Sequence, residues 1–219
     1  MLVFYTVTVG WIFSVCLHEF GHAAVAYRGG DHTVAEKGYL TFNPLKYVDP
    51  LWSVVMPVLF MMIGGIGLPG GAVYINRRLL RSRAWDTAVS LAGPAMNVML
   101  VVVLAALFWT GLVKPDATHP LACALAFLVQ LQLSALILNL LPVPPLDGFQ
   151  AVAPWLSPRL RERALDLSNI CFFVLFILLW YLEPMNDLFW SAVHGLSELL
   201  GIDRRLGWIG FREFRFWER

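Results

Sequence analysis

Residues 15–27 read VCLHEFGHAAVAY and place two histidines and a glutamate inside an apolar run from Leu2 to Tyr27. The run is long enough to cross a bilayer as a helix, since about 20 apolar residues suffice. A charged residue such as Asp near the middle of a span costs about 2.5 to 3.5 kcal/mol, so such residues usually serve a function. The stretch therefore predicts a membrane helix that carries a functional site.

The composition of the whole chain also predicts a membrane protein. Of 219 residues, 58% are hydrophobic and 14% are charged, and the mean hydropathy is +0.67. Soluble domains average about 45 to 50% apolar and about 25% charged residues. Backbone in contact with lipid must be hydrogen-bonded within helices, so we expect an all-α membrane protein, a multi-span helical bundle. The net charge of +1, with no basic recognition segment, predicts no nucleic-acid partner.

Three further apolar runs predict further helices, and a periodic segment follows them. The runs cover residues 87–113, 121–141 and 170–182. In residues 185–200, apolar side chains recur at spacings of three and four, which predicts an amphipathic helix at the membrane interface. Cys16, Cys123 and Cys171 lie in apolar surroundings without metal-type spacing and are interpreted as packing residues.

Residues 51–76 do not have the pattern of a straight span. Residues 51–69 are apolar but rich in glycine and proline, which favours a bend, so we expect a re-entrant segment there. Residues 72–76, AVYIN, are compatible with a short membrane-associated strand.

We expect one integral membrane domain over residues 1–219. Within it, residues 1–153 form a three-helix catalytic core, 154–201 contain a C-terminal span and the amphipathic helix, and 202–219 form a polar and aromatic tail. The number of full crossings after residue 168 stays open.

The HEFGH sequence indicates a metal site. His18 and His22 are four residues apart and share one face of a helix, and Glu19 is displaced by about 100° and still reaches the same pocket. This arrangement offers two imidazoles for zinc and a carboxylate for its water. A catalytic zinc ion takes three protein ligands and one open position. The third ligand must come from another part of the chain.

Three acidic residues beside apolar runs are candidates for that third ligand: Asp86, Asp147 and Glu183. Asp147 is favoured because the sequence NLLPVPPLDG unwinds the chain just past a span, and irregular backbone at membrane depth is tolerated where it lines a cavity. The alternative is that Asp147 and Gly148 form an ordinary turn at a helix end.

Three motifs together resemble the signatures of the site-2 proteases, which are intramembrane zinc metalloproteases. They are HEFGH at 18–22, GPAMN at 93–97 and NLLPVPPLDG at 139–148. The resemblance covers about residues 2–153. The loop at 30–50 is similar to that of compact family members, and we expect neither a PDZ nor a CBS domain.

The resemblance implies one Zn²⁺ per chain, held by His18, His22 and Asp147, with Glu19 as general base and then general acid. It also implies that Asn97 and Asn139 line the site. A transmembrane substrate must unwind locally before it can be cut. Residues 72–76 offer an added strand to such an unwound segment, which makes Val73 and Tyr74 candidate substrate-binding residues.

The metal ligands constrain the topology. Asp147 can meet the two histidines only if residues 51–69 return to the side they came from. Lysines and arginines in residues 28–50, 77–83 and 159–163 would then share one side, as the positive-inside rule asks of a cytoplasmic face. We expect a prokaryotic cell-membrane protein with its N-terminus outside and its active site nearer the cytoplasm.

The expected partners are a transmembrane protein substrate and the lipid bilayer, and the sequence leaves the oligomeric state open. Two other functions remain as alternatives. One is a non-catalytic membrane scaffold of the same fold with a vestigial metal site. The other is a metal transporter, which would want polar residues along its path and often a repeated architecture.

Overall fold

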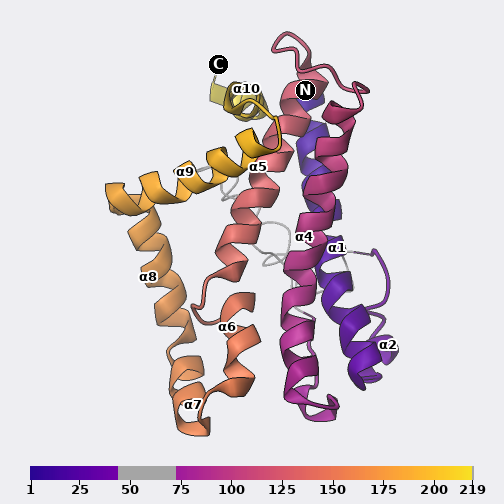
Figure 1. Ribbon diagram of the computed structural model, residues 1–219, viewed down its shortest axis with the longest axis vertical. Helices are drawn as coiled ribbons and strands as arrows, with labels where there is room; N and C mark the ends of the chain where they lie inside the picture. The colour runs from indigo at the N-terminus through magenta and orange to yellow at the C-terminus, as the bar shows by residue number, and fades with distance from the viewer. Residues whose placement is uncertain (44–72, 219) are drawn as a thin grey trace.

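The computed structural model describes residues 1–43 and 73–218, and within them it contains helices and no strand. Three long helices stand side by side: α1 (Leu2–Gly29), α4 (Arg83–Trp109) and α5 (Pro120–Leu140) (Figure 1). Each is long and apolar enough to cross a membrane. The chain is therefore an integral membrane protein, and the predicted all-α class is confirmed.

Helix α5 is the centre of the bundle, with 78% of its most apolar window buried. It packs against α1, α4, α9 (Glu183–Leu199) and α10 (Arg204–Phe214). Pro120 begins it, where a missing N–H has no cost. Prolines at 142, 144 and 145 prevent it from continuing past Leu140.

Helices α1 and α4 run in opposite directions. The backbone N–H of Arg81, just before α4, donates to the carbonyl oxygen of Gly29, the last residue of α1, at 2.9 Å. At the other end, Val3 and Val7 share a buried cluster with Leu104. The end of α1 and the start of α4 therefore lie together, as the predicted topology requires. The predicted re-entrant segment at 51–69 lies outside the described residues.

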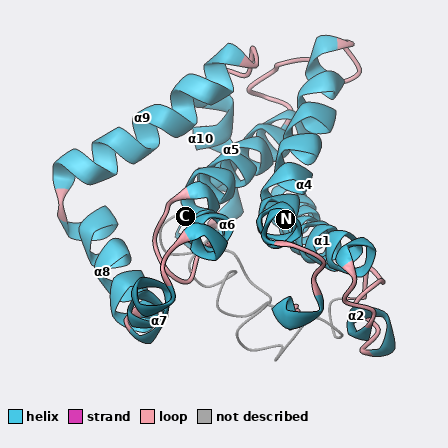
Figure 2. Cartoon of the chain, turned by 60° about the horizontal axis from the view of Figure 1, so that its bottom comes forward, coloured by secondary structure: helices cyan, strands magenta, loops and turns pink. Residues whose placement is uncertain are grey.

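After α5, the chain leaves this core and returns to it through a series of shorter helices (Figure 2). After α6 (Asp147–Val152) and η4 (Ala153–Trp155), helices α7 (Pro158–Asp166) and α8 (Ser168–Tyr181) are bent by 61° and make a fourth candidate span if taken together. Helix α9 then crosses back toward α5, and α10 lies near the N-terminus (Figure 1). Phe214 of α10 stacks on Phe4 of α1 with ring centroids 5.3 Å apart.

The strand expected at 72–76 is not formed in the described part, residues 73–76. These residues form neither helix nor strand, and no described strand pairs with them. Side chains bond their backbone instead: Glu19 accepts from the N–H of Val73, and Lys37 donates to the carbonyl oxygen of Tyr74. The short helices α2 (Thr33–Glu36) and η3 (Arg77–Leu79) flank this segment, and η5 (Phe216–Glu218) ends the described chain.

Candidate metal centre

The two histidines of HEFGH meet on the buried face of α1. Their ring centroids are 4.7 Å apart, and the Nε2 atoms of His18 and His22 are separated by 3.0 Å. The four-residue spacing on a helix places the second ring one turn beyond the first. Both Nε2 atoms therefore point to one position between α1 and α4.

The opposite nitrogen of each ring is held by α4. The Nδ1–H of His18 donates to Oδ1 of Asn97, and the Nδ1–H of His22 donates to the carbonyl oxygen of Val89, both at 2.7 Å. Because these oxygens can only accept, Nδ1 carries the hydrogen and Nε2 presents a lone pair. This is the state in which histidine binds a metal ion, and the outer hydrogen bond fixes the ring.

The third donor comes from the junction of α5 and α6. Oδ2 of Asp147 lies 3.2 Å from Nε2 of His18 and 3.4 Å from Nε2 of His22. This oxygen is buried and has no hydrogen-bond donor among the described residues. Three potential metal-ligand atoms thus converge on one point, and a cation bound there would offset the repulsion between their lone pairs.

The spacing of the three atoms fits zinc. A tetrahedral site with bonds of about 2.0 to 2.1 Å separates its ligand atoms by about 3.3 Å, and the three distances here are 3.0, 3.2 and 3.4 Å. Two imidazoles and one carboxylate, with a fourth position open, form the ligand set of catalytic zinc enzymes.

Helix α4 comes close enough to leave no room for a side chain at Gly93. A Cβ at residue 93 would lie 2.3 Å from Nε2 of His22 and 2.5 Å from Nε2 of His18. Glycine is therefore the residue that lets α4 pack against the metal site.

Glu19 lines the same cavity as the three residues that supply the donor atoms. Its side chain is buried, and Oε2 accepts a hydrogen bond from the N–H of Val73 at 3.1 Å. The cavity has a volume of about 380 Å³, and Phe172 shows that α8 also reaches its wall. The remaining lining comes from α1, α4, residues 73–77 and the α5–α6 junction: His18, His22, Ile75, Arg77, Val89, Ser90, Asn139, Pro145, Leu146, Asp147 and Gln150.

The four residues predicted to bind substrate lie in different places. Asn139 and Val73 line the cavity. Asn97 is buried behind His18 and does not line the cavity. Tyr74 is 67% exposed and also lies outside the lining. Whether any of them contacts substrate stays a prediction.

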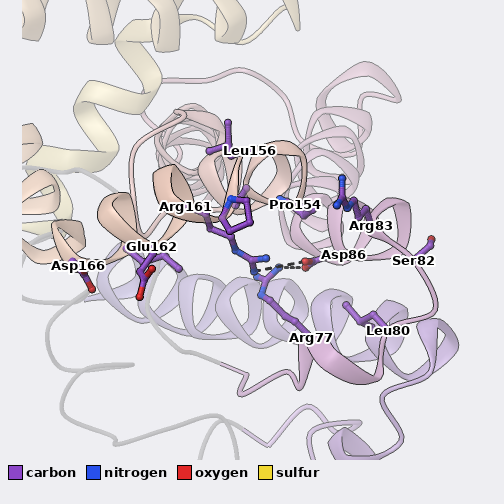
Figure 3. Close-up of a pocket in the computed structure, with 13 residues that line it drawn as sticks. Arg77, Leu80, Ser82, Arg83, Asp86, Pro154, Leu156, Arg161, Glu162 and Asp166 are labelled. Carbon is purple, nitrogen blue, oxygen red and sulfur yellow. Dashed lines mark hydrogen bonds and ion pairs between the residues drawn. The ribbon is translucent and has the colours of Figure 1, made fainter.

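The competing third ligands have other positions. Figure 3 shows Arg77 and Arg161 converging on Asp86. These residues line a second cavity, of about 620 Å³, between the start of α4 and α7. Asp86 is therefore committed to two guanidinium groups. Glu183 begins α9 and is not part of the metal-type cluster formed by His18, His22 and Asp147 among the described residues.

Two contributions to the site were not predicted from the sequence: the close approach of α4 at Gly93 and the hydrogen bond from His22 to the carbonyl oxygen of Val89. The spacing of four between Gly93 and Asn97 places both on one face of α4, so GPAMN contained the signal for a face that packs on the histidines. The carbonyl oxygen of Val89 is a backbone group, and no residue type signals its role.

Three relatives are similar to most of the chain. A protein of Mycobacterium tuberculosis strain H37Rv, named "Putative zinc metalloprotease Rip2", is 45% identical over 216 residues, 98% of this chain and 82% of that protein. A protein of the same name from Mycolicibacterium smegmatis is 43% identical over 219 residues, with the same coverage. YwhC of Bacillus subtilis, named in the same way, is 30% identical over 184 residues, 80% of each chain. No family model and no solved structure matches the chain.

Proposed function

Because this chain belongs to the site-2 protease family of zinc metalloproteases, we propose that it cuts a peptide bond within or next to a transmembrane segment of another protein. Its cofactor is zinc. In this proposal, His18, His22 and Asp147 hold the ion, and Glu19 is the catalytic base. The catalytic part comprises residues 1–153 of a single membrane domain.

One observation carries the proposal: three lone-pair atoms and a buried carboxylate share one cavity between membrane-spanning helices. The donor atoms lie on α1 and at the start of α6, so they are fixed by the helix core and not by an aqueous domain. A substrate bond that reaches them must itself be inside or beside the membrane. This supports a substrate that spans the bilayer.

The chemistry follows from the protein groups. When bound, zinc supplies Lewis acidity that makes water a nucleophile near neutral pH and stabilises negative charge on the scissile carbonyl oxygen. Glu19 accepts the proton of the attacking water and then donates it to the nitrogen of the leaving amine. The N–H of Val73 holds the carboxylate of Glu19 in the cavity. Asn97 keeps His18 in the tautomer that presents Nε2.

The substrate reaches these groups in an extended conformation. A helix satisfies its own backbone and hides the scissile bond, so the segment to be cut has to unwind. Residues 73–76 are outside any helix, and Val73 and Ile75 line the cavity, so this segment provides a template for strand pairing. Val73 and Tyr74 belong to this template, and Asn139 lies across the cavity as a helper for the substrate carbonyl group.

The active site faces the cytoplasm of a prokaryotic cell in this proposal. Ten of the 16 lysines and arginines lie in residues 28–83 and 159–163, and the histidines are near that end of α1. Helix α10, with Arg204 and Arg212, lies at the opposite end (Figure 1). There Arg212 lies over the ring of Trp208, a pair suited to the membrane interface. The proposed cytoplasmic side therefore has most, but not all, of the lysines and arginines.

The test uses Glu19→Gln, a substitution that removes the base and preserves size. Purified wild-type and variant proteins are reconstituted with a transmembrane reporter, and zinc content and cleavage are measured on the same samples. The variant should keep about one zinc per chain and lose cleavage by at least a hundredfold. Glu36→Gln, at an exposed glutamate of α2, is the matched control and should cleave normally.

The alternative functions give different results. A scaffold would bind the reporter and leave it uncut in the wild type and in both variants. A transporter would move zinc into sealed vesicles. Cleavage by Glu19→Gln at the wild-type rate would refute the proposed mechanism.

A further inference from the structure

Residues 73–76 have two edges with different neighbours. In an extended chain, the N–H and C=O groups of one residue point to the same side, and the next residue points to the opposite side. The contacts of residues 73–76 alternate in this way: Val73 donates to Glu19, and Val73 and Ile75 both line the cavity. Tyr74 and Asn76 turn the other way, toward the chain that follows α1.

The edge that turns away from the cavity is closed by two side chains. Lys37 donates from Nζ to the carbonyl oxygen of Tyr74 at 3.1 Å, and the N–H of Asn76 donates to Oδ2 of Asp31 at 2.6 Å. An acceptor and a donor thus alternate along this edge, as they would from a neighbouring strand. Asp31 and Lys37 take the place of that strand.

Asp31 is the buried member of this pair. Its side chain is 0% exposed, and its two oxygens have different partners. Oδ1 accepts from the N–H of Thr33 at 3.1 Å and from its hydroxyl group at 2.6 Å, while Oδ2 accepts from Asn76. Among the described residues no lysine or arginine forms an ion pair with it. Oδ1 has two donors, but Asn76 is the one described donor to Oδ2. Loss of the contact with Asn76 would therefore leave a buried carboxylate oxygen unsatisfied.

On the opposite edge of the segment, the N–H of Val73 donates to Glu19, and the other backbone groups have no partner among the described residues. Ile75 has no hydrogen bond from its N–H or C=O group to any described residue, and neither does the C=O group of Val73. This edge lies on the side of Glu19. Val73 and Asn76 are three residues apart, at most about 10 Å along the chain, so a shift at Asn76 changes the register at Glu19.

From this alternation we infer that Asp31 is a positioning residue for proteolysis, and the inference rests on the function proposed above. Asp31 holds the closed edge so that the groups of Ile75 pair with an extended substrate strand. The paired strand then presents its scissile bond to Glu19 and the metal site. Asp31 touches neither substrate nor metal and acts through the backbone of Asn76.

Asp31→Asn is the main test, because asparagine keeps one acceptor oxygen and turns the other into a donor. The variant should lose kcat/KM for a transmembrane reporter by about tenfold or more, with zinc content unchanged. Thr33→Val is the matched control: it removes a donor to Oδ1 and leaves the contact with Asn76, so cleavage should stay within about twofold of wild type.

A second pair of variants isolates the same hydrogen bond from the other side. Asn76→Pro removes the N–H that reaches Asp31, whereas Asn76→Ala keeps it and removes only the side chain that caps η3. Asn76→Pro should match Asp31→Asn, and the two changes together should cost no more than either alone. Asn76→Ala keeps the N–H and should therefore lose much less cleavage than Asn76→Pro.

Two further measurements separate positioning from general structural damage. A reporter N-methylated at the residue that pairs with Ile75 should be cut poorly by wild type, and the same methylation should cost Asp31→Asn much less. Amide hydrogen exchange of residues 73–76 should be faster in Asp31→Asn, with exchange in α1 unchanged. Equal sensitivity to methylation, loss of zinc, or exchange equal to wild type would each overturn the inference.

Failure of this inference and failure of the proposed function are distinguishable. If wild-type protein cuts no membrane reporter, the proposed function fails, and amide exchange still shows whether Asp31 fixes residues 73–76. If wild type and Asp31→Asn cut equally well, only the positioning role is wrong.

Discussion

A single methyl group on Gly93 provides a sharp test of the metal site. At residue 93 a Cβ would lie 2.3 Å from Nε2 of His22, and real Cβ atoms essentially never approach within 3.0 Å, so the atoms must separate by at least 0.7 Å. His18 is crowded as well, at 2.5 Å. Metal-ligand distances tolerate only about 0.2 Å. Gly93→Ala should therefore weaken zinc binding by about 100-fold, the upper end of the effect of mutations around a metal site.

The assay measures the zinc content of purified protein after dialysis against a series of chelators of increasing zinc affinity. Gly195→Ala is the matched control, since a Cβ there meets nothing within 4 Å, and alanine is favoured over glycine in a helix by about 1 kcal/mol. The control should keep zinc as wild type does. If Gly93→Ala kept its zinc with wild-type affinity, the site would not lie between α1 and α4 as described.

Two further predictions concern the α5–α6 junction and the C-terminal helices. A Cβ at Gly148 would lie 2.2 Å from the carbonyl oxygen of Leu140, so Gly148→Ala should displace Asp147 and reduce zinc content about tenfold or more, measured by the same assay. In α9, outside the candidate spans, burial and then Arg204 hold the pKa of His194 below its ordinary 6.5, although Glu198 raises it. Because the unfolded chain takes up this proton first, stability should fall as pH drops from 6.5 to the folded pKa, and an NMR titration of Arg204→Ala should give a higher His194 pKa. An unchanged pKa would contradict the assigned cause.

Much of the helical core could be predicted from local pattern. Apolar runs of sufficient length predicted α1, α4 and α5 to within about one turn, because lipid leaves helices as the available backbone structure. The four-residue spacing of His18 and His22 placed both rings on one face without any long-range information. The amphipathic period of residues 185–200 likewise matches α9.

The rest depends on contacts between distant residues, which local pattern does not contain. Asp86 and Asp147 both follow or precede apolar helices, and only the arginines around Asp86 explain why it is unavailable to a metal. Residues 73–76 have a strand pattern, but Asp31 and Lys37 bond one edge of the segment, and no described strand pairs with the other edge. The tail after residue 201 contains helix α10, which packs on α5 through Gly207 and Gly210.

The most direct test of the central claim is zinc stoichiometry in Asp147→Ala beside Asp86→Ala. Both substitutions remove a largely buried carboxylate, but only Asp147 lies within 3.4 Å of both imidazole Nε2 atoms. The account predicts about one zinc per chain in wild type and in Asp86→Ala, and almost none in Asp147→Ala. Full zinc in Asp147→Ala would contradict it.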